Sequence, residues 1–300
     1  MSIRFIFNPK SGPRRRNAHV LPLLREFIAS RGLDAELEVT ASPGHATHLA
    51  RQAVADGCER VVSVGGDGTM NEIAQALVHT PAALALVPCG SGNGLARHLG
   101  LPIAHLPALE LAADPLARIA TIDTGTVNRR PFFNAMGLGF DAEISRRFAQ
   151  VTGRGLAGYV RAVLGAFGGW KGERCQIEAG SEREAIEILL IAIANSDEYG
   201  SGAIIAPGAR VDDGLLDLVA IRPLGLFQAM ALAVRLFRGT LDRSASIRHL
   251  RGVRFVIERS APGLIHTDGE CHSEGATLEI VVQPGSLRMV TPAQGAKAPA

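Results

Sequence analysis

Three hundred residues suffice for two domains, because a single hydrophobic core seldom grows that large. The net charge is only +2, from 31 basic and 29 acidic residues, and aromatic residues make up 5% of the chain. This composition argues against nucleic-acid binding, which relies on basic surfaces and stacked aromatic side chains.

The first half of the sequence alternates between strand-like and helical patterns. Strands are predicted at residues 3–7, 35–39, 61–64 and 83–87, and helices at residues 16–31, 45–56, 69–79 and 95–99. This alternation predicts a doubly wound parallel sheet with helices on both faces. The carboxyl ends of its strands would lie along one edge, which is where open α/β sheets bind ligands.

Residues 61–78, VVSVGGDGTMNEIAQALV, contain a buried strand, a turn of glycines and a helix that begins near Thr69. The free N–H groups and the positive dipole at such a helix start favour a phosphate. Asp67 would repel a phosphate unless a cation lay between them, so the turn also suggests bound Mg²⁺. The alternative is an ordinary strand–turn–helix corner.

Three further loops follow predicted strands, and they contain Asn8 in NPKSG, Thr40, and the run PCGSGNG at residues 88–94. Asn8 could bind a nucleotide, or it could cap the turn before Pro9. The run at residues 88–94 fits neither the GxGxxG fingerprint nor a P-loop. Four polar or glycine-rich loops at successive strand ends are more specific than any one of them.

The second half is rich in strands, which predicts a second, mainly antiparallel domain. Strands are predicted at residues 119–126, 132–136, 175–179, 184–194, 215–221, 253–258, 263–267 and 277–282, and helices near residues 142–149, 156–167 and 224–237. We expect an N-terminal domain of residues 1–120, which residues 286–292 could complete, and a second domain of residues 121–285. Residues 293–300 are expected to be a disordered tail.

Two acidic clusters stand out in the second half. Asp212-Asp213-Gly214 is a turn signal, and Asp213 with nearby carbonyls could also hold Mg²⁺. Asp268-Gly269-Glu270 follows an apolar strand, so its two carboxylates could enter one site, where one meets a metal and the other takes a proton from a hydroxyl. The alternative for this second cluster is a hairpin turn with exposed acids.

Five sequence blocks together resemble the diacylglycerol kinase catalytic-domain family, which includes bacterial lipid kinases and sphingosine kinases. They are NPKSG at residues 8–12, GGDGTMNE at 65–72, PCGSGNGLAR at 88–97, YGSGAIIAPGARVDDGLLD at 199–217 and DGE at 268–270. The resemblance spans nearly the whole chain, although GGDGT alone is shared with NAD kinases. It implies an α/β nucleotide domain, a C-terminal β-sandwich-like domain and an active site in the cleft between them.

The resemblance also implies roles for individual residues. Glu270 would be the general base, with Asp268 and Asp67 as partners in the catalytic site. The residues that would bind ATP are Asn8, Thr40, Gly65, Gly66, Asp67, Gly68, Thr69, Asn71, Glu72 and Ser91. A structural Mg²⁺ would be held by the carbonyls of Arg210 and Leu215 and the side chain of Asp213. Many bacterial members have an acid where this chain has Gly94.

The expected function is that of an ATP- and Mg²⁺-dependent lipid kinase, active in phospholipid biosynthesis, which phosphorylates a diacylglycerol-like hydroxyl. The alternatives are an NAD kinase-type phosphotransferase and an inactive relative that only binds lipid. The sequence shows neither a signal peptide nor an apolar run that could span a bilayer, and its four cysteines form no CxxC pair. We therefore expect a cytoplasmic protein with reduced thiols and peripheral membrane contact; a homodimer is left open.

Overall fold

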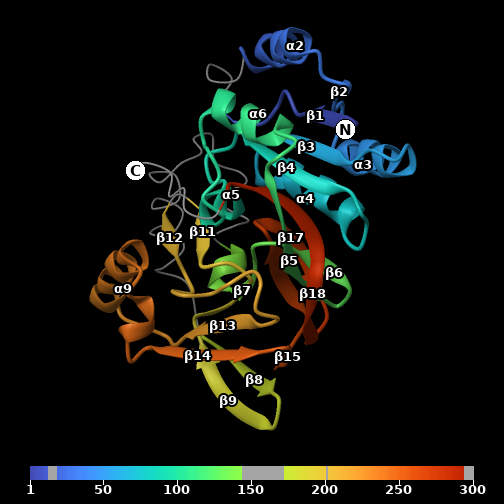
Figure 1. Ribbon diagram of the computed structural model, residues 1–300. Coiled ribbons are helices and arrows are strands. Elements are labelled where there is room, and N and C mark those ends of the chain that lie inside the picture. The colour runs from blue at the N-terminus through green and yellow to red at the C-terminus, as the bar shows by residue number, and fades with distance from the viewer. Residues whose placement is uncertain (13–18, 144–171, 201, 294–300) are drawn as a thin grey trace. The chain divides into compact units, whose positions relative to one another are not determined.

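A computed structural model describes residues 1–12, 19–143, 172–200 and 202–293 of the chain. The chain divides into two compact units, shown in Figure 1. Unit 1 comprises Met1–Ile122 and the C-terminal residues from Gly285, and unit 2 comprises Asp123–Pro284. The helices predicted near residues 142–149 and 156–167, and the tail predicted to be disordered, fall wholly or largely outside the described residues.

Unit 1 contains a parallel sheet, as the sequence predicts. Its strands are, in spatial order, β2 (Ala35–Val39), β1 (Ile3–Phe7), β3 (Arg60–Gly65) and β4 (Ala83–Pro88). The C-terminal end of β18 (Thr277–Thr291) extends this sheet, because Met289 pairs in parallel with Leu84 of β4. β1, β3 and β4 are buried along their whole length, which is typical of strands covered on both faces.

The helices of unit 1 cover both faces of this sheet. They are α2 (Val20–Arg31), α3 (His45–Ala55), α4 (Asp67–Leu77), α5 (Gly94–His98) and α6 (His105–Ala113). On one face, α2 and α6 share a core with Phe5 and Val62. On the other face, α3 and α4 pack against each other and against β1 and β3. The predicted doubly wound α/β architecture is therefore confirmed.

Unit 2 is built mainly from two antiparallel sheets. The first contains, in spatial order, β14 (Ile247–Gly252), β13 (Leu216–Ile221), β10 (Leu190–Ala194), β7 (Ala135–Gly139), β16 (Gly263–Thr267) and β17 (Glu270–Glu274). The second contains the N-terminal end of β18 with β15 (Arg254–Arg259), β8 (Glu173–Ala179) and β9 (Glu182–Ile188), and with β5 (Arg118–Val127) and β6 (Arg130–Phe132). Smaller elements are β11 (Glu198–Gly200), β12 (Ala203–Ile204), α9 (Leu226–Arg238) and η1 (Leu241–Arg243).

One hydrophobic core lies between the two sheets of unit 2. Phe255 and Ile257 enter it from the second sheet, and Ile193 and Leu218 enter it from the first. Two sheets that share one buried core form a sandwich. The predicted C-terminal β-sandwich-like domain is therefore confirmed.

Two of the strands predicted in the second half are each divided in the structure. The strand predicted at residues 132–136 is interrupted because the N–H groups of Phe133 and Asn134 bond a carboxylate instead of a neighbouring strand. The strand predicted at residues 184–194 is interrupted at Leu189, where the chain passes from one sheet to the other. Conversely, residues 277–282 and 286–290 belong to one continuous strand, β18.

Arg259, at the end of β15, holds the open end of the β16–β17 hairpin. Its buried guanidinium donates hydrogen bonds to the carbonyls of Gly263, Leu264, Glu274 and Gly275, at 2.8 to 3.2 Å. Several donors in a fixed fork suit this cluster of carbonyls. The opposite end of this hairpin carries the Asp-Gly-Glu motif, so Arg259 fixes the base of a candidate functional element.

We expect Arg259→Met to lower the free energy of unfolding by about 2–3 kcal/mol, because four partly buried carbonyls would lose their hydrogen-bond donor. The matched control is Arg254→Met on the same strand, whose exposed guanidinium pairs with Glu279 and Glu178 in solvent. Such exposed pairs contribute little, so this control should unfold near the wild-type temperature. Thermal unfolding followed by circular dichroism checks both variants, and equal melting temperatures would contradict the role of Arg259.

Candidate functional site

The predicted nucleotide residues of unit 1 lie along the carboxyl edge of its parallel sheet. Thr40 follows β2, Asn8 follows β1, the Gly65–Thr69 turn follows β3, and Ser91 lies in the loop after β4. Backbone hydrogen bonds join neighbouring members of this row: the Thr40 N–H donates to the Phe7 carbonyl at 2.9 Å, and the Asn8 N–H donates to the Val64 carbonyl at 3.0 Å. The Cys89 N–H likewise donates to the Gly65 carbonyl at 2.7 Å, so all four loops start from positions fixed by the sheet.

The NPKSG loop is bound to the start of α4 through side chains. Asn8 Nδ2 donates to Thr69 Oγ1 at 2.9 Å, and Ser11 Oγ lies 3.2 Å from the same oxygen. The N–H of Gly66 donates to Ser11 Oγ at 3.2 Å. Ser11 is a residue of this site that the sequence analysis did not single out, although its place in NPKSG was a usable signal.

The two glycine-rich loops pack against each other backbone to backbone. A Cβ added to Gly90 would lie 2.9 Å from the Cα of Gly66 and 2.9 Å from Oδ1 of Asn93. A Cβ added to Gly65 would lie 2.6 Å from the Cβ of Thr69. These distances are shorter than side chains tolerate, so the glycines are required first by the contact between the loops and within the turn.

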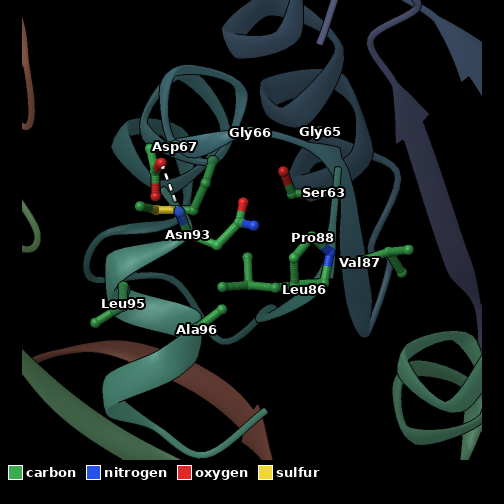
Figure 2. A pocket seen from close by; sticks show the side chains of 11 residues that line it. Ser63, Gly65, Gly66, Asp67, Leu86, Val87, Pro88, Asn93, Leu95 and Ala96 are labelled. Atoms are coloured by element: carbon green, nitrogen blue, oxygen red, sulfur yellow. Dashed lines mark hydrogen bonds between the residues drawn. The ribbon is translucent and has the colours of Figure 1, made fainter. Parts of the chain in front are cut away.

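Figure 2 shows a small pocket next to this loop contact. Gly66 and Asp67 line it from one loop and Asn93 from the other, while Ser63 and Leu86 line it from strands β3 and β4. The Asn93 side chain also stabilises its own loop. Its Oδ1 accepts the N–H of Gly90, and its Nδ2 donates to the Gly90 carbonyl. The pocket therefore has a rigid lining supplied by both loops.

Asp67 connects the two loops directly. Its Oδ2 accepts the N–H of Asn93 at 2.9 Å, a bond drawn in Figure 2, and its Oδ1 accepts the N–H of Gly94 at 3.1 Å. These N–H groups begin α5, so Asp67 caps a helix that belongs to the other loop. Burial raises the pKa of Asp67, and the two N–H bonds and the charge of Arg97 oppose that rise.

This arrangement changes which groups can meet a phosphate. The N–H groups of Gly66, Gly90, Asn93 and Gly94 are already bonded within the chain. A phosphate at this edge would meet the other amides of the turns, together with the dipole at the start of α4. Gly94 takes part through its backbone N–H.

The remaining predicted nucleotide residues differ in their surroundings. Glu72 Oε2 accepts the N–H of Ala46 at 3.1 Å, which satisfies the start of α3. Asn71 is buried, and its Oδ1 has no hydrogen-bond partner among the described residues. A buried acceptor without a donor costs about 1–3 kcal/mol, so a donor from water or a ligand would be stabilising there. Ser91 is exposed.

In unit 2, Asp268-Gly269-Glu270 forms the turn of the β16–β17 hairpin. Thr267 pairs with Glu270, and the two turn residues Asp268 and Gly269 have φ of 51° and 86°. Positive φ at both central residues is the mark of a type I′ turn, for which Asp-Gly is a favoured pair. Glu270 comes directly after this turn and is exposed.

The Asp268 carboxylate points toward the backbone of residues 133–135. It accepts the N–H groups of Phe133, Asn134 and Ala135, at 2.8, 2.8 and 2.9 Å. Burial raises the pKa of Asp268 to about 6, and these three N–H bonds act in the opposite direction. Asp268 therefore fixes the turn to the segment that leads into β7.

A buried polar chain that the sequence analysis missed lies behind the same turn. Asp141 Oδ2 accepts the hydroxyl of Tyr199 at 2.7 Å and lies 2.9 Å from His266 Nε2. The Nδ1 of His266 in turn accepts the N–H of Gly269 at 3.3 Å. The pairing of β16 with β7 brings His266 close to Asp141, which follows β7, and Tyr199 joins them from β11.

At the predicted Mg²⁺ position, the Asp213 carboxylate already has a cationic neighbour, Arg251. Asp213 Oδ2 accepts a hydrogen bond from Arg251, and Oδ1 accepts the N–H of Leu215 at 3.1 Å. Asp123 holds the same turn by accepting the N–H of Gly214 at 2.7 Å. The guanidinium already neutralises the carboxylate, so Mg²⁺ would fit here only if Arg251 moved away. The Mg²⁺ site at Arg210, Asp213 and Leu215 stays a prediction.

Comparisons with known proteins cover nearly the whole chain. Residues 2–127 match the family described as diacylglycerol kinase catalytic domain, and residues 134–291 match the YegS C-terminal NAD kinase beta sandwich-like domain. A probable lipid kinase YegS-like of Pseudomonas aeruginosa is 34% identical over 267 residues, or 87% of this chain and 86% of that protein. A diacylglycerol kinase of Bacillus subtilis is 27% identical over 274 residues, or 89% of each chain.

A crystal structure of a diacylglycerol kinase from Bacillus anthracis aligns with 98% of both chains, at a TM-score of 0.72 and 19% identity. At this identity the likeness shows the fold alone.

We expect Gly90→Ala to destabilise unit 1 by about 1–3 kcal/mol, because its Cβ would meet the backbone of Gly66, which cannot rotate away. Gly275→Ala is the control, since its added Cβ meets nothing within 4 Å. Thermal unfolding without any ligand measures both variants. Unchanged melting of Gly90→Ala would show that the two loops do not touch.

We also expect Asp67→Asn to lower the free energy of unfolding by about 1–3 kcal/mol in buffer free of nucleotide and Mg²⁺. The amide offers one acceptor oxygen where the carboxylate offers two, so the N–H of Asn93 or Gly94 would lose its partner. Asp114→Asn, at an exposed acid of the same unit, is the control. If Asp67 served only to bind Mg²⁺, its variant would match the wild type in this metal-free measurement.

Proposed function

Because this chain belongs to the diacylglycerol kinase catalytic-domain family, we propose that it transfers the γ-phosphate of ATP to the hydroxyl group of a diacylglycerol-like lipid. The observation that carries the proposal is the pair of contacting glycine loops at the carboxyl edge of the unit 1 sheet. Open α/β sheets bind their ligands at this edge, and the start of α4 offers a positive dipole to a phosphate.

Unit 1 holds the donor in this proposal. Asn8, Thr40, the Gly65–Thr69 turn and Ser91 surround the phosphates and the sugar of ATP, and Ser11 joins them through Thr69. Asp67 acts by positioning, since its oxygens hold the second loop in place. Mg²⁺, when it is bound with ATP, neutralises the phosphate charge during transfer.

Unit 2 supplies the general base. The exposed carboxylate of Glu270 takes the proton of the lipid hydroxyl while that oxygen forms a bond to the γ-phosphorus, and the bond from phosphorus to the β-phosphate oxygen breaks to release ADP. Asp268 and the Asp141–His266 pair keep the turn in place through backbone N–H groups. Arg259 holds the other end of the same hairpin.

The acceptor class is proposed from the relatives, which are named lipid kinase and diacylglycerol kinase. The test incubates the protein with labelled ATP and Mg²⁺ against diacylglycerol, monoacylglycerol, phosphatidylglycerol, a sphingoid base and NAD. We expect a labelled lipid. Labelled NAD without any lipid product would favour an NAD kinase, and lipid binding without any labelled product would favour an inactive relative.

We expect Glu270→Gln to lower kcat by roughly 10²- to 10⁴-fold, the usual contribution of a general base, with little change in ATP affinity. The control is Glu274→Gln on the same strand, whose carboxylate binds Asn128. Steady-state kinetics give kcat, and nucleotide binding measured by calorimetry gives the affinity. Full transfer by the Glu270 variant with every acceptor would remove Glu270 from the mechanism.

A further inference from the structure

Helix α9 lies on the outside of unit 2 (Figure 1). It exposes a row of large apolar side chains. Phe227, Met230, Val234 and Phe237 are 86%, 58%, 51% and 40% exposed. Their spacing of three and four residues places them within an arc of about 80° on the helix, because successive residues turn by 100°. We call these four residues the apolar stripe.

The apolar stripe is not the face by which α9 is attached to its unit. Leu232 is buried and Leu236 is half-buried, and both pack against the cluster that contains Phe140 and Val219. A surface helix usually carries polar residues on the face opposite the core. Here that face carries two phenylalanines, a methionine and a valine, so the helix has a second apolar face with no packing role among the described residues.

The charges around the apolar stripe have one predominant sign. Between residues 225 and 243 the chain has three basic residues and one acid, a net charge of +2 (3 minus 1). Arg235 and Arg238 lie in the last turn of α9, where Arg235 is half-buried and Arg238 is exposed, and Arg243 follows after Asp242. Cationic groups that flank an apolar helix face complement a surface that combines hydrocarbon with negative charge.

We propose that the apolar stripe docks on the surface of an anionic phospholipid bilayer. The inference rests on the proposed function, since an enzyme whose acceptor is a lipid meets that acceptor in a membrane. Phe227 and Phe237 enter the acyl boundary from the two ends of the helix, and the arginines contact the phosphate groups. Among the described residues no helix has the length and hydropathy needed to span a bilayer.

A second copy of the chain suits the stripe less well. A two-fold interface uses the same surface of both copies, so it would bring two segments that each carry a net charge of +2 into one interface. Such like charges oppose association, whereas an anionic bilayer attracts them. The charge pattern therefore favours the lipid surface over self-association.

The test is flotation of the full chain with vesicles of phosphatidylglycerol and phosphatidylcholine, compared with vesicles of phosphatidylcholine alone. We expect preferential binding to the anionic vesicles. Combining Phe227→Ser with Phe237→Ser should weaken binding by roughly tenfold for each phenylalanine removed. Combining Arg238→Gln with Arg243→Gln should weaken it by roughly fivefold for each arginine, and only with anionic vesicles.

The control is Leu116→Ser in unit 1, which removes a side chain that is 90% exposed but lies outside α9. It should bind vesicles as the wild type does, and circular dichroism should show that all variants are folded. Wild-type binding by the double phenylalanine variant would overturn the proposal. The proposal would also be overturned if gel filtration showed that this variant has a different oligomeric state while its vesicle binding is unchanged. The apolar stripe would then be an interface between copies of the chain.

Transfer to a short-chain diacylglycerol dispersed in detergent separates this inference from the proposed function. We expect the double phenylalanine variant to retain transfer to the dispersed acceptor while it loses transfer to vesicle-borne diacylglycerol. A wild-type protein that phosphorylates the dispersed lipid but does not float contradicts the docking surface alone. A protein that floats through the stripe but phosphorylates no lipid contradicts the kinase function and supports the docking surface.

Discussion

The two hydrogen bonds from Asn93 and Gly94 to the Asp67 carboxylate hold the candidate nucleotide edge together. They join loops that follow adjacent parallel strands, and the two backbones lie so close that a Cβ added to Gly90 would lie 2.9 Å from the Cα of Gly66. A conformation that packs this tightly has few alternatives, because neither loop can shift without moving the other. The shape offered to a ligand is therefore a property of the loop pair rather than of either glycine motif.

Unit 2 also contains a carboxylate that accepts several backbone N–H groups. Asp268 accepts three successive backbone N–H groups, much as Asp67 accepts two, and both carboxylates lie in motifs whose acids would ordinarily be assigned to chemistry. A carboxylate bound in this way orders the backbone around it, and its oxygens are occupied before any substrate arrives. Glu270 differs from both because its side chain is exposed. The proposed division between positioning acids and a reacting acid rests on this difference in exposure.

Much of the fold was predictable because local patterns and tertiary packing agree: residues 3–7, 35–39 and 263–267 form the predicted strands. The strand predicted at residues 132–136 failed because Asp268, over 130 residues away, captures its N–H groups. β17 was missed because Glu270–Glu274 is mostly polar and is held by pairing with β16. The glycine loops and the two acidic clusters of the second half could also be found in the sequence. Their hydrogen-bond partners could not, because a partner such as Arg251 for Asp213 lies on a strand that is distant in sequence.

The hairpin that carries Glu270 has a consequence for how its motif should be recognised in related chains. Only two residues, Asp268 and Gly269, connect β16 to β17, and Thr267 lies opposite Glu270. Side chains alternate between the two faces of a sheet, so one residue inserted into β17 just before Glu270 would direct its carboxylate to the opposite face. A relative could then keep both acids and the glycine of the motif and still lack the proposed base. Loop length is as informative as residue identity when homologues of this chain are sorted into active and inactive members.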